Sequence, residues 1–183
     1  WATGSTITSC SDAFEALSLC VDYLKIVVEG GAKEYELQRM LEAANLAGKA
    51  INISKTTAAH AWSYGITNQH GIAHGHAVWL TLPVIFQLHA TATVDKVTDP
   101  RGQQHVTKIL KNLMDILRIP SPEQASAYLK KYLSSIHVES ELCNIGANTI
   151  ELRRLLSNKV NMQRLMNNPV SLDYKDISDI FTL

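Results

Sequence analysis

Apolar residues recur every three or four positions along most of the chain, which is the spacing of helices that bury one face. No segment alternates convincingly at the two-residue period of a half-buried strand. The first helix is expected to end at Gly30 and Gly31 and to take Ser9 or Ser11 as its N-terminal cap. Its buried positions are expected to be Phe14, Leu17, Val21, Leu24 and Val28.

A second helix is predicted from about Ala32, and its pattern allows it to continue, with a kink, as far as Tyr64. Small residues in its second half would let a neighbouring helix pack closely. The next stretch, 65–73, contains two glycines and several polar residues, which predicts a loop. The buried stripe expected for the second helix consists of Leu37, Met40, Leu41 and Ala44.

The rest of the chain also has helical patterns. Residues 74–90 are strongly apolar and predict a buried helix pair, with Pro83 at a kink or in a first turn. A turn at 98–102 precedes an amphipathic helix, and Ser121 followed by Pro122 has the pattern of another helix start. Further helices are expected from about 148 or 149, carrying Leu152, Leu155, Leu156 and Leu165, and after Ser171, carrying Ile177, Ile180 and Phe181.

These patterns predict an all-α fold without a sheet, a single domain over 1–183 with roughly seven to nine helices. The 17 basic and 17 acidic side chains cancel, which argues against a nucleic-acid or membrane-surface partner. Three cysteines without metal-type spacing favour a reducing, cytoplasmic location. No targeting peptide is recognisable, and a start at Trp1 instead of Met suggests a fragment.

Histidines cluster in one part of the chain. Of the seven, four lie between positions 60 and 76, namely His60, His70, His74 and His76. A single histidine on a helix is usually structural, but a cluster favours a divalent metal site, because imidazole binds iron, zinc and nickel alike. The sequence therefore predicts such a site without identifying its metal.

The spacing of these histidines predicts different roles for them. His74 follows the predicted glycine-containing loop, so the chain can fold back and place it beside His60. His70 and His76 are expected to lie outside the ligand set, in an outer shell or on the substrate side. Residues four apart share a helix face, which predicts a polar stripe lining a pocket and made of Asn52, Thr56, His60 and Tyr64.

Two histidines alone cannot hold a catalytic divalent ion, because such sites generally use three or more protein ligands, usually including a carboxylate. No Asp or Glu occurs between Glu42 and Asp95. The remaining ligands are therefore expected from distant parts of the chain or from sequence that a fragment lacks. The chain also lacks a glycine-rich phosphate loop, so it shows no means of holding a dinucleotide.

The block from Gly48 to Ala61, followed by His74-Gly75-His76-Ala77 and Leu80-Thr81-Leu82-Pro83, resembles the C-terminal helical domain of the iron-containing (group III) alcohol dehydrogenases. The resemblance covers essentially the whole chain, down to Asn167-Asn168-Pro169. It implies the helical fold that this family shares with dehydroquinate synthase. It also implies an N-terminal NAD(P)-binding domain absent from this chain, with a small aldehyde or alcohol bound between the two domains.

The resemblance also implies roles for individual residues. His60 and His74 match two metal ligands of the family, with Fe²⁺ as the expected ion and Zn²⁺ as the alternative, while an Asp and a His further upstream would complete the set. Tyr64 stands where many members carry another histidine, and it would act in catalysis by hydrogen-bonding the substrate oxygen or relaying a proton. The fragment alone is expected to be inactive.

The segment from Asn52 to Thr57, together with Ser63-Tyr64, resembles the phosphonoacetaldehyde reductase branch of the family. Asn52, Lys55 and Thr56 would then bind substrate, because an ammonium and hydroxyls can clamp a phosphonate. In the alternative interpretation Lys55 extends into solvent and the threonines bond to the helix backbone. A neutral aldehyde substrate, a non-catalytic helical binding module and an assembly of identical chains are left open.

Overall fold

The structure, a computed structural model, describes residues 1–145 and 162–172. Within these ranges the only strand-like pairing is an isolated antiparallel bridge between Val97 and Val170, which confirms the all-α fold class. Short 3-10 helices lie at Val94–Lys96, Pro122–Gln124 and Leu142–Ile145. The α-helices are α1 (Ile7–Val28), α2 (Glu34–Ser54), α3 (Ala58–His70), α4 (His74–Trp79), α5 (Leu82–Ala90), α6 (Gln103–Leu117), α7 (Ala125–Ser135) and α9 (Met162–Met166).

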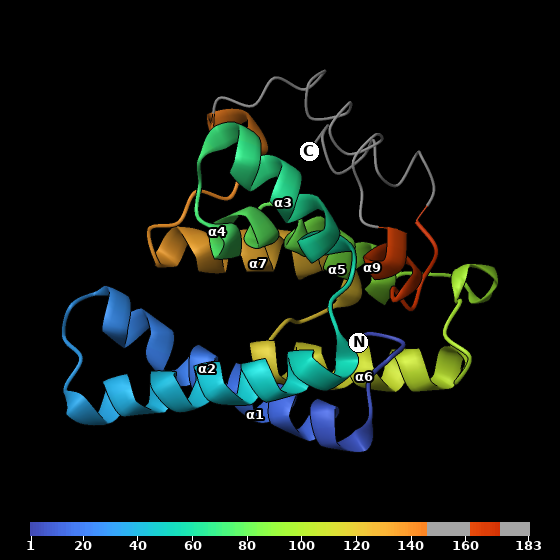
Figure 1. Cartoon of the computed structure of the whole chain (residues 1–183), viewed down its shortest axis with the longest axis horizontal. Helices are drawn as coiled ribbons and strands as arrows, with labels where there is room; N and C mark the ends of the chain where they lie inside the picture. Colours follow the sequence, from blue (N-terminus) through green and yellow to red (C-terminus); the bar gives the residue numbers. More distant parts are fainter. Residues whose placement is uncertain (146–161, 173–183) are drawn as a thin grey trace.

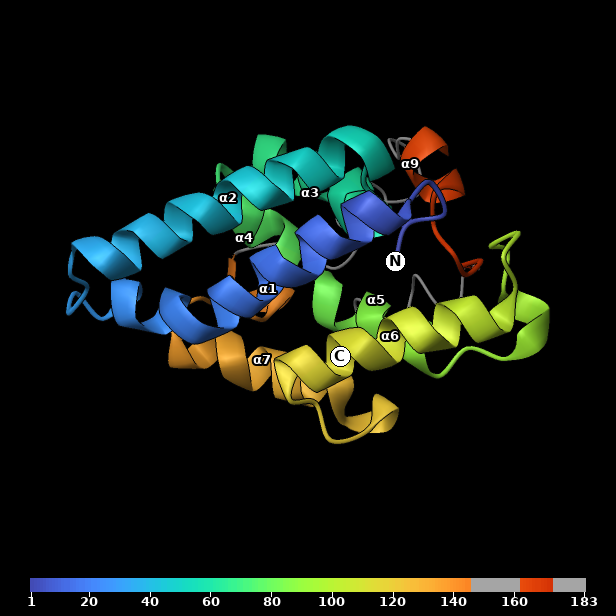
Figure 2. The same ribbon diagram turned by 90° about the horizontal axis from the view of Figure 1, so that it is seen from below.

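The helices form two layers (Figure 1). One layer contains α1, α2 and α6, with α1 and α2 packed as an antiparallel pair, as the view from below also shows (Figure 2). The other layer contains α3, α4, α5, α7 and α9. The chain crosses from the first layer to the second at residues 55–57, between α2 and α3. This crossing positions the candidate site.

Two apolar clusters form the core. One lies under α3, α4 and α5 and contains the fully buried side chains of Trp62 and Ile66. The other joins the two layers, since Val106 and Leu110 of α6 pack with Phe86 of α5. The helices that carry His60 and His74 therefore rest on the first cluster and are fixed by its packing.

Several predicted elements are confirmed. The apolar stretch 74–90 is the pair α4 and α5, with Pro83 in the first turn of α5. The turn at 98–102 and the amphipathic helix α6 follow as expected. The helices predicted beyond about 148 and after Ser171 lie mostly outside the described residues, although Leu165 is in α9 and packs against the first cluster.

The predicted helix caps are wrong in detail. The cap of α1 is Thr6, whose hydroxyl accepts from the Ser9 backbone N–H while the Ser9 hydroxyl accepts from the Thr6 N–H. Ser9 is thus the partner of the cap in a reciprocal capping box. Ser121 makes no side-chain cap, and the start of α7 is instead held by the Gln87 side chain, which accepts from the Ser126 N–H at 3.0 Å.

The second helix does not continue, with a kink, as far as Tyr64. α2 ends at Ser54 because Lys55 adopts a φ of 58° and a ψ of −169°, which no helix accommodates. α3 then runs to His70, through the predicted loop, and ends where Gly71 takes a left-handed φ of 67°. The polar stripe expected on one helix is therefore divided between α2, the crossing and α3.

Most of the stripe expected to be buried on α2 is exposed, since Leu37, Leu41 and Ala44 are exposed and Met40 is half-buried. Leu37 and Leu41 are 48% and 72% exposed, whereas Ala43 and Ala50 are buried. The small side chains of Ala43 and Ala50 let α1 pack closely against α2, so these alanines face inward while Leu37 and Leu41 face outward. Among the described helices none is long and apolar enough to span a membrane.

Candidate metal and substrate site

The turn between α3 and α4 brings two histidines together. Gly71 ends α3, and α4 begins three residues later at His74. The ring centroids of His60 and His74 lie 5.4 Å apart. Two imidazoles at this separation can approach one metal ion between them, provided that each presents a nitrogen lone pair.

The hydrogen bonds of Ser63 determine which nitrogen of His74 carries the proton. The Ser63 hydroxyl donates to the His60 backbone carbonyl at 2.9 Å and lies 3.2 Å from His74 Nδ1. Since the hydroxyl proton is already used, Nδ1 carries the hydrogen and donates it to Ser63. His74 Nε2 is then left with a lone pair, as a metal-ligating nitrogen requires.

His60 is neutral at physiological pH. Its side chain is half-buried, and burial, followed by electrostatic interaction with His74 and Arg164, lowers the pKa of His60 to about 4. A neutral imidazole can bind a metal without first losing a proton. The donor chemistry of both histidines therefore fits part of a divalent ion's ligand set.

The described residues do not complete that set. Within 1–145 and 162–172 no group of three or more His, Cys, Asp and Glu side chains is placed to hold a metal ion. His76, which is near in sequence, bonds through Nε2 to the Glu139 carbonyl at 2.7 Å, and His70 is the last residue of α3. The site in this chain is thus a pair of imidazoles, not a closed cage.

Tyr64 lies next to the histidine pair and contacts a distant arginine. Its ring centroid is 5.1 Å from that of His74. Arg164 of α9 donates to the Tyr64 hydroxyl oxygen at 2.6 Å, and its guanidinium carbon lies 4.6 Å from the centre of the ring. Because the Tyr64 oxygen accepts this bond, its own O–H proton remains able to donate elsewhere.

The three proposed substrate-binding residues lie at the end of α2 and in the crossing. Asn52 and Lys55 are exposed and Thr56 is half-buried. The Lys55 ammonium donates to the Asn52 backbone carbonyl at 2.9 Å, so it bonds to a C-terminal carbonyl of α2. Residues 55–57 are not helical, so Lys55 and Thr56 lie in the crossing and not on the helix that carries His60.

Two pockets adjoin this crossing. The larger has a volume of about 510 Å³ and is lined by Thr3, Ile51, Lys55, Thr56, Gln163, Arg164, Met166 and Asn167. The smaller has a volume of about 230 Å³ and lies between α1, α6 and the start of α3, with His60 in its wall. Lys55 and Thr56 line both pockets, so the crossing forms the partition between them.

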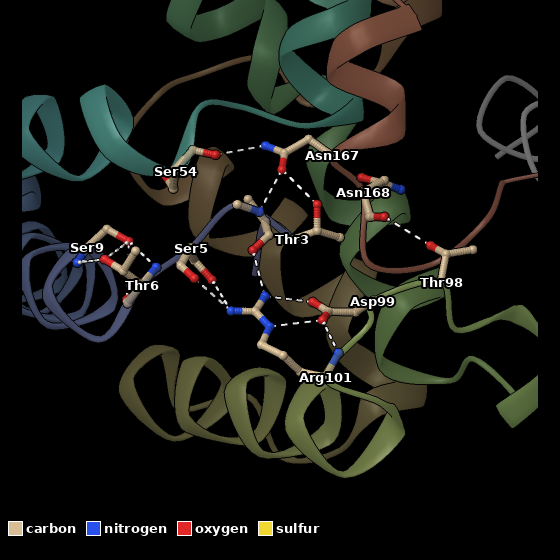
Figure 3. Close-up of polar contacts among 12 residues, drawn as sticks. Thr3, Ser5, Thr6, Ser9, Ser54, Thr98, Asp99, Arg101, Asn167 and Asn168 are labelled. Atoms are coloured by element: carbon tan, nitrogen blue, oxygen red, sulfur yellow. Dashed lines mark hydrogen bonds and ion pairs between the residues drawn. The ribbon is translucent and has the colours of Figure 1, made fainter.

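Asn167 holds the crossing in place (Figure 3). Its side-chain nitrogen donates to the backbone carbonyls of Ser54 at 2.8 Å and Thr56 at 3.1 Å. Its side-chain oxygen accepts from the Gly4 N–H and from the Thr3 hydroxyl. The next residue, Asn168, is buried, and its oxygen lies 3.4 Å from the N–H of Ala58, the first residue of α3.

Sequence reasoning did not identify Ser63, Arg164 or Asn167 as site residues. Arg164 contacts a tyrosine 100 positions away, and Asn167 bonds to residues more than 110 positions away. No local spacing signals such contacts. Ser63 lies three positions from His60, a spacing that allows a hydroxyl to reach the preceding turn, and this was a signal that could have been used.

Comparison with known proteins places the chain in a family. Residues 3–183 match the profile described as Fe-containing alcohol dehydrogenase family, C-terminal. A curated relative, phosphonoacetaldehyde reductase from Streptomyces viridochromogenes, is 28% identical over 138 residues. The aligned part is 74% of this chain and 34% of that protein, so the chain spans only part of the relative's length.

Solved structures show the same fold. Sulfoacetaldehyde reductase from Bifidobacterium kashiwanohense, in complex with NAD⁺, is 25% identical, with a TM-score of 0.76 over 100% of this chain and 45% of that one. An alcohol dehydrogenase from Oenococcus oeni is 20% identical, with a TM-score of 0.79 over 99% of this chain and 46% of that one. The chain belongs to the Fe-containing alcohol dehydrogenase family and represents its C-terminal helical domain.

Proposed function

We propose that the chain is the metal-binding half of an NAD(P)-dependent reductase that interconverts a small aldehyde and its alcohol. The observation that carries this proposal is the imidazole pair of His60 and His74, with ring centroids 5.4 Å apart. The other metal ligands and a Rossmann-like nucleotide-binding domain would precede this segment. The share of its relatives' length that the chain spans supports this division.

The chain's own residues would act on the carbonyl oxygen. When bound, a divalent ion, Fe²⁺ or alternatively Zn²⁺, would polarise the aldehyde oxygen while NAD(P)H supplies the hydride. His60 and His74 would hold the ion, and Ser63 keeps His74 in the tautomer that ligation needs. Tyr64 would donate its proton to the oxygen as the alcohol forms, since its own oxygen accepts from Arg164.

We propose an anionic two-carbon aldehyde, such as phosphonoacetaldehyde, as the substrate. Two of the proteins similar to this chain are reductases named for aldehydes that carry a phosphonate or a sulfonate. Asn52, Lys55 and Thr56 offer an amide, an ammonium and a hydroxyl at the crossing between α2 and α3. A small neutral aldehyde or alcohol is the alternative substrate within the same proposal.

The proposal is tested on the full-length protein that would join this chain to its nucleotide-binding domain. Metal content and NAD(P)H oxidation are measured with phosphonoacetaldehyde and with acetaldehyde, for the wild type, His60→Ala and His74→Ala. Each variant is expected to lose metal and at least about 100-fold in kcat/KM, because removing a ligand exceeds the effect of removing an outer-shell partner. His76→Ala is the matched control, since His76 bonds to the Glu139 carbonyl instead.

Two results would contradict the proposal. A reduction rate unchanged in His60→Ala and His74→Ala would remove the histidine pair from the reaction. A wild-type protein that binds neither Fe²⁺ nor Zn²⁺ would favour the non-catalytic helical module.

A further inference from the structure

The larger pocket beside the crossing is positively charged and rich in hydrogen-bond donors. Its lining includes two cations, Lys55 and Arg164, and no carboxylate among the described residues. Thr56 and Gln163 add a hydroxyl and an amide, and neither side chain bonds to another described residue. A pocket of about 510 Å³ with this lining suits a small tetrahedral oxyanion better than a neutral or cationic group.

Arg164 links this pocket to the histidine pair. Arg164 lines the pocket, and its guanidinium donates to the hydroxyl of Tyr64. The Tyr64 ring in turn lies 5.1 Å from His74. A ligand held by Arg164 would therefore sit one side chain away from the proposed metal, which suits a short substrate with an aldehyde at one end and an anion at the other.

Lys55 occupies a backbone conformation that favours glycine. Its φ of 58° and ψ of −169° lie close to a region that residues with a Cβ rarely adopt. The surrounding contacts hold this conformation, because Asn167 bonds to the carbonyls of Ser54 and Thr56 on either side. A lysine kept where glycine would be relaxed points to a role for its side chain.

We infer that this pocket is the subsite for the oxyanion of the substrate, with Arg164 as its principal ligand and Lys55 and Thr56 completing it. The inference deepens the proposed function and rests on it for the identity of the substrate, but the anion binding itself can be measured separately. A guanidinium can donate charge-assisted hydrogen bonds to a phosphonate or sulfonate in addition to the bond that Arg164 gives to the Tyr64 hydroxyl. The shared ligand chemistry is a tetrahedral oxyanion on a small carbon chain.

Binding is measured on the full 183-residue chain by isothermal titration calorimetry, with methylphosphonate and methanesulfonate as unreactive probes. We expect the wild type to bind at least one of them, and the tighter of the two identifies the anion. Arg164→Gln is expected to weaken binding by about tenfold or more, since charge-assisted hydrogen bonds are the strong ones. Arg39→Gln is the matched control, because Arg39 pairs with Glu42 on α2 and lies outside the pocket.

A second pair of variants separates a binding role from a structural one. Lys55→Gly is expected to raise the urea midpoint of unfolding, because glycine relaxes the backbone, and yet to weaken methylphosphonate binding several-fold. A purely structural lysine would show the first effect without the second. Lys49→Met is the control, as Lys49 is an exposed lysine on α2 that does not line the pocket.

In the full-length enzyme, Arg164→Gln is expected to raise KM for the anionic aldehyde and to lower its kcat/KM relative to acetaldehyde by about tenfold. Arg164→Lys, which keeps the charge, should recover part of the loss. Such a recovery would show that the loss in Arg164→Gln comes from the missing charge and not from a folding defect. If neither probe binds the wild type, or if Arg164→Gln binds as tightly, the subsite is wrong even where metal-dependent reduction is found. If methylphosphonate binds through Arg164 but no aldehyde is reduced, the proposed function is wrong and the subsite stands.

Discussion

The Asn167 side chain uses its whole hydrogen-bonding capacity to join three segments. One donated bond reaches Ser54 at the end of α2, and its oxygen accepts two bonds from residues 3 and 4 (Figure 3). The second donated bond reaches Thr56 in the crossing. The shape and polarity of a carboxamide match this arrangement, because it presents donors on one side and an acceptor on the other. Asn167 therefore holds the backbone on either side of Lys55, and although it lines the larger pocket, the donors and the acceptor of its carboxamide are already used by these bonds.

We expect Asn167→Ala to lower the free energy of unfolding by about 2–3 kcal/mol, because backbone carbonyls lose their donors. Asn167→Asp should be at least as destabilising, since a carboxylate would face the carbonyl oxygens of Ser54 and Thr56. Urea denaturation measures both. Asn45→Ala, at an exposed position of α2, is the control and should change stability by less than about 0.5 kcal/mol. Equal stabilities for Asn167→Ala and Asn45→Ala would show that the bonds to the crossing contribute nothing.

At the scale of the element, the sequence predicts a helix well where its signals are local. α6 was expected from its apolar positions alone, and Pro83 correctly marked the first turn of α5. The end of α2 was missed because Lys55 carries no local signal of a break. That conformation is held by Asn167, which lies far along the chain, so only the folded structure reveals it.

The candidate site, too, could be predicted only where its signals are local in the sequence. The proximity of His60 and His74 could be predicted, because a glycine and a short turn lie between two helical patterns. The oxyanion pocket could not, since Arg164 approaches from α9 through tertiary packing. The direction of the α2 apolar face was wrong because periodicity defines a face without identifying its neighbour.

The turn between α3 and α4 depends on Gly71, whose φ is 67°. A methyl group at this position would meet no atom within 4 Å, so the cost of Gly71→Ala is backbone strain alone. We expect a loss of about 1 kcal/mol in stability, together with weaker metal binding by the full-length protein, because the turn places His74 beside His60.

Gly48→Ala provides a control for which we expect stability to change in the opposite direction. Gly48 lies inside α2, and a methyl group there also meets nothing within 4 Å. Alanine should stabilise the helix by about 0.5–1 kcal/mol and leave metal binding unchanged. Thermal melts and metal titrations of the two variants distinguish the effects, and a Gly71→Ala protein as stable as the wild type would contradict the prediction.

At the scale of the whole molecule, a buried histidine couples stability to pH. His89 of α5 is 2% exposed and bonds through Nδ1 to the Ile85 carbonyl. Burial, opposed in part by that bond, lowers the pKa of His89 to about 4. In the unfolded chain the pKa returns to about 6.5, so below that pH the unfolded state binds more protons. The stability contributed by neutral His89 is present above about pH 6.5 and is lost as the pH falls through about 4.

We therefore expect the free energy of unfolding to fall by about 3 kcal/mol between pH 7 and pH 4 through His89 alone. His89→Gln should flatten this part of the profile, because glutamine does not titrate. Urea unfolding at a series of pH values measures the difference between the two proteins. Since both retain His60, whose pKa is also lowered, the comparison isolates His89. Parallel profiles would contradict a neutral, buried imidazole at this position.

At the crossing between the layers, the side chains proposed to bind the anion differ from the side chain that holds the backbone. Lys55, Arg164 and Asn167 all line the pocket, but the side-chain amide of Asn167 already donates to main-chain carbonyls at the end of α2 and in the crossing. Those main-chain bonds do not depend on which side chains stand at 55 and 56. Varying the side chain at position 55 while preserving asparagine at 167 is accordingly a route to altering substrate preference while the crossing keeps its main-chain bonds.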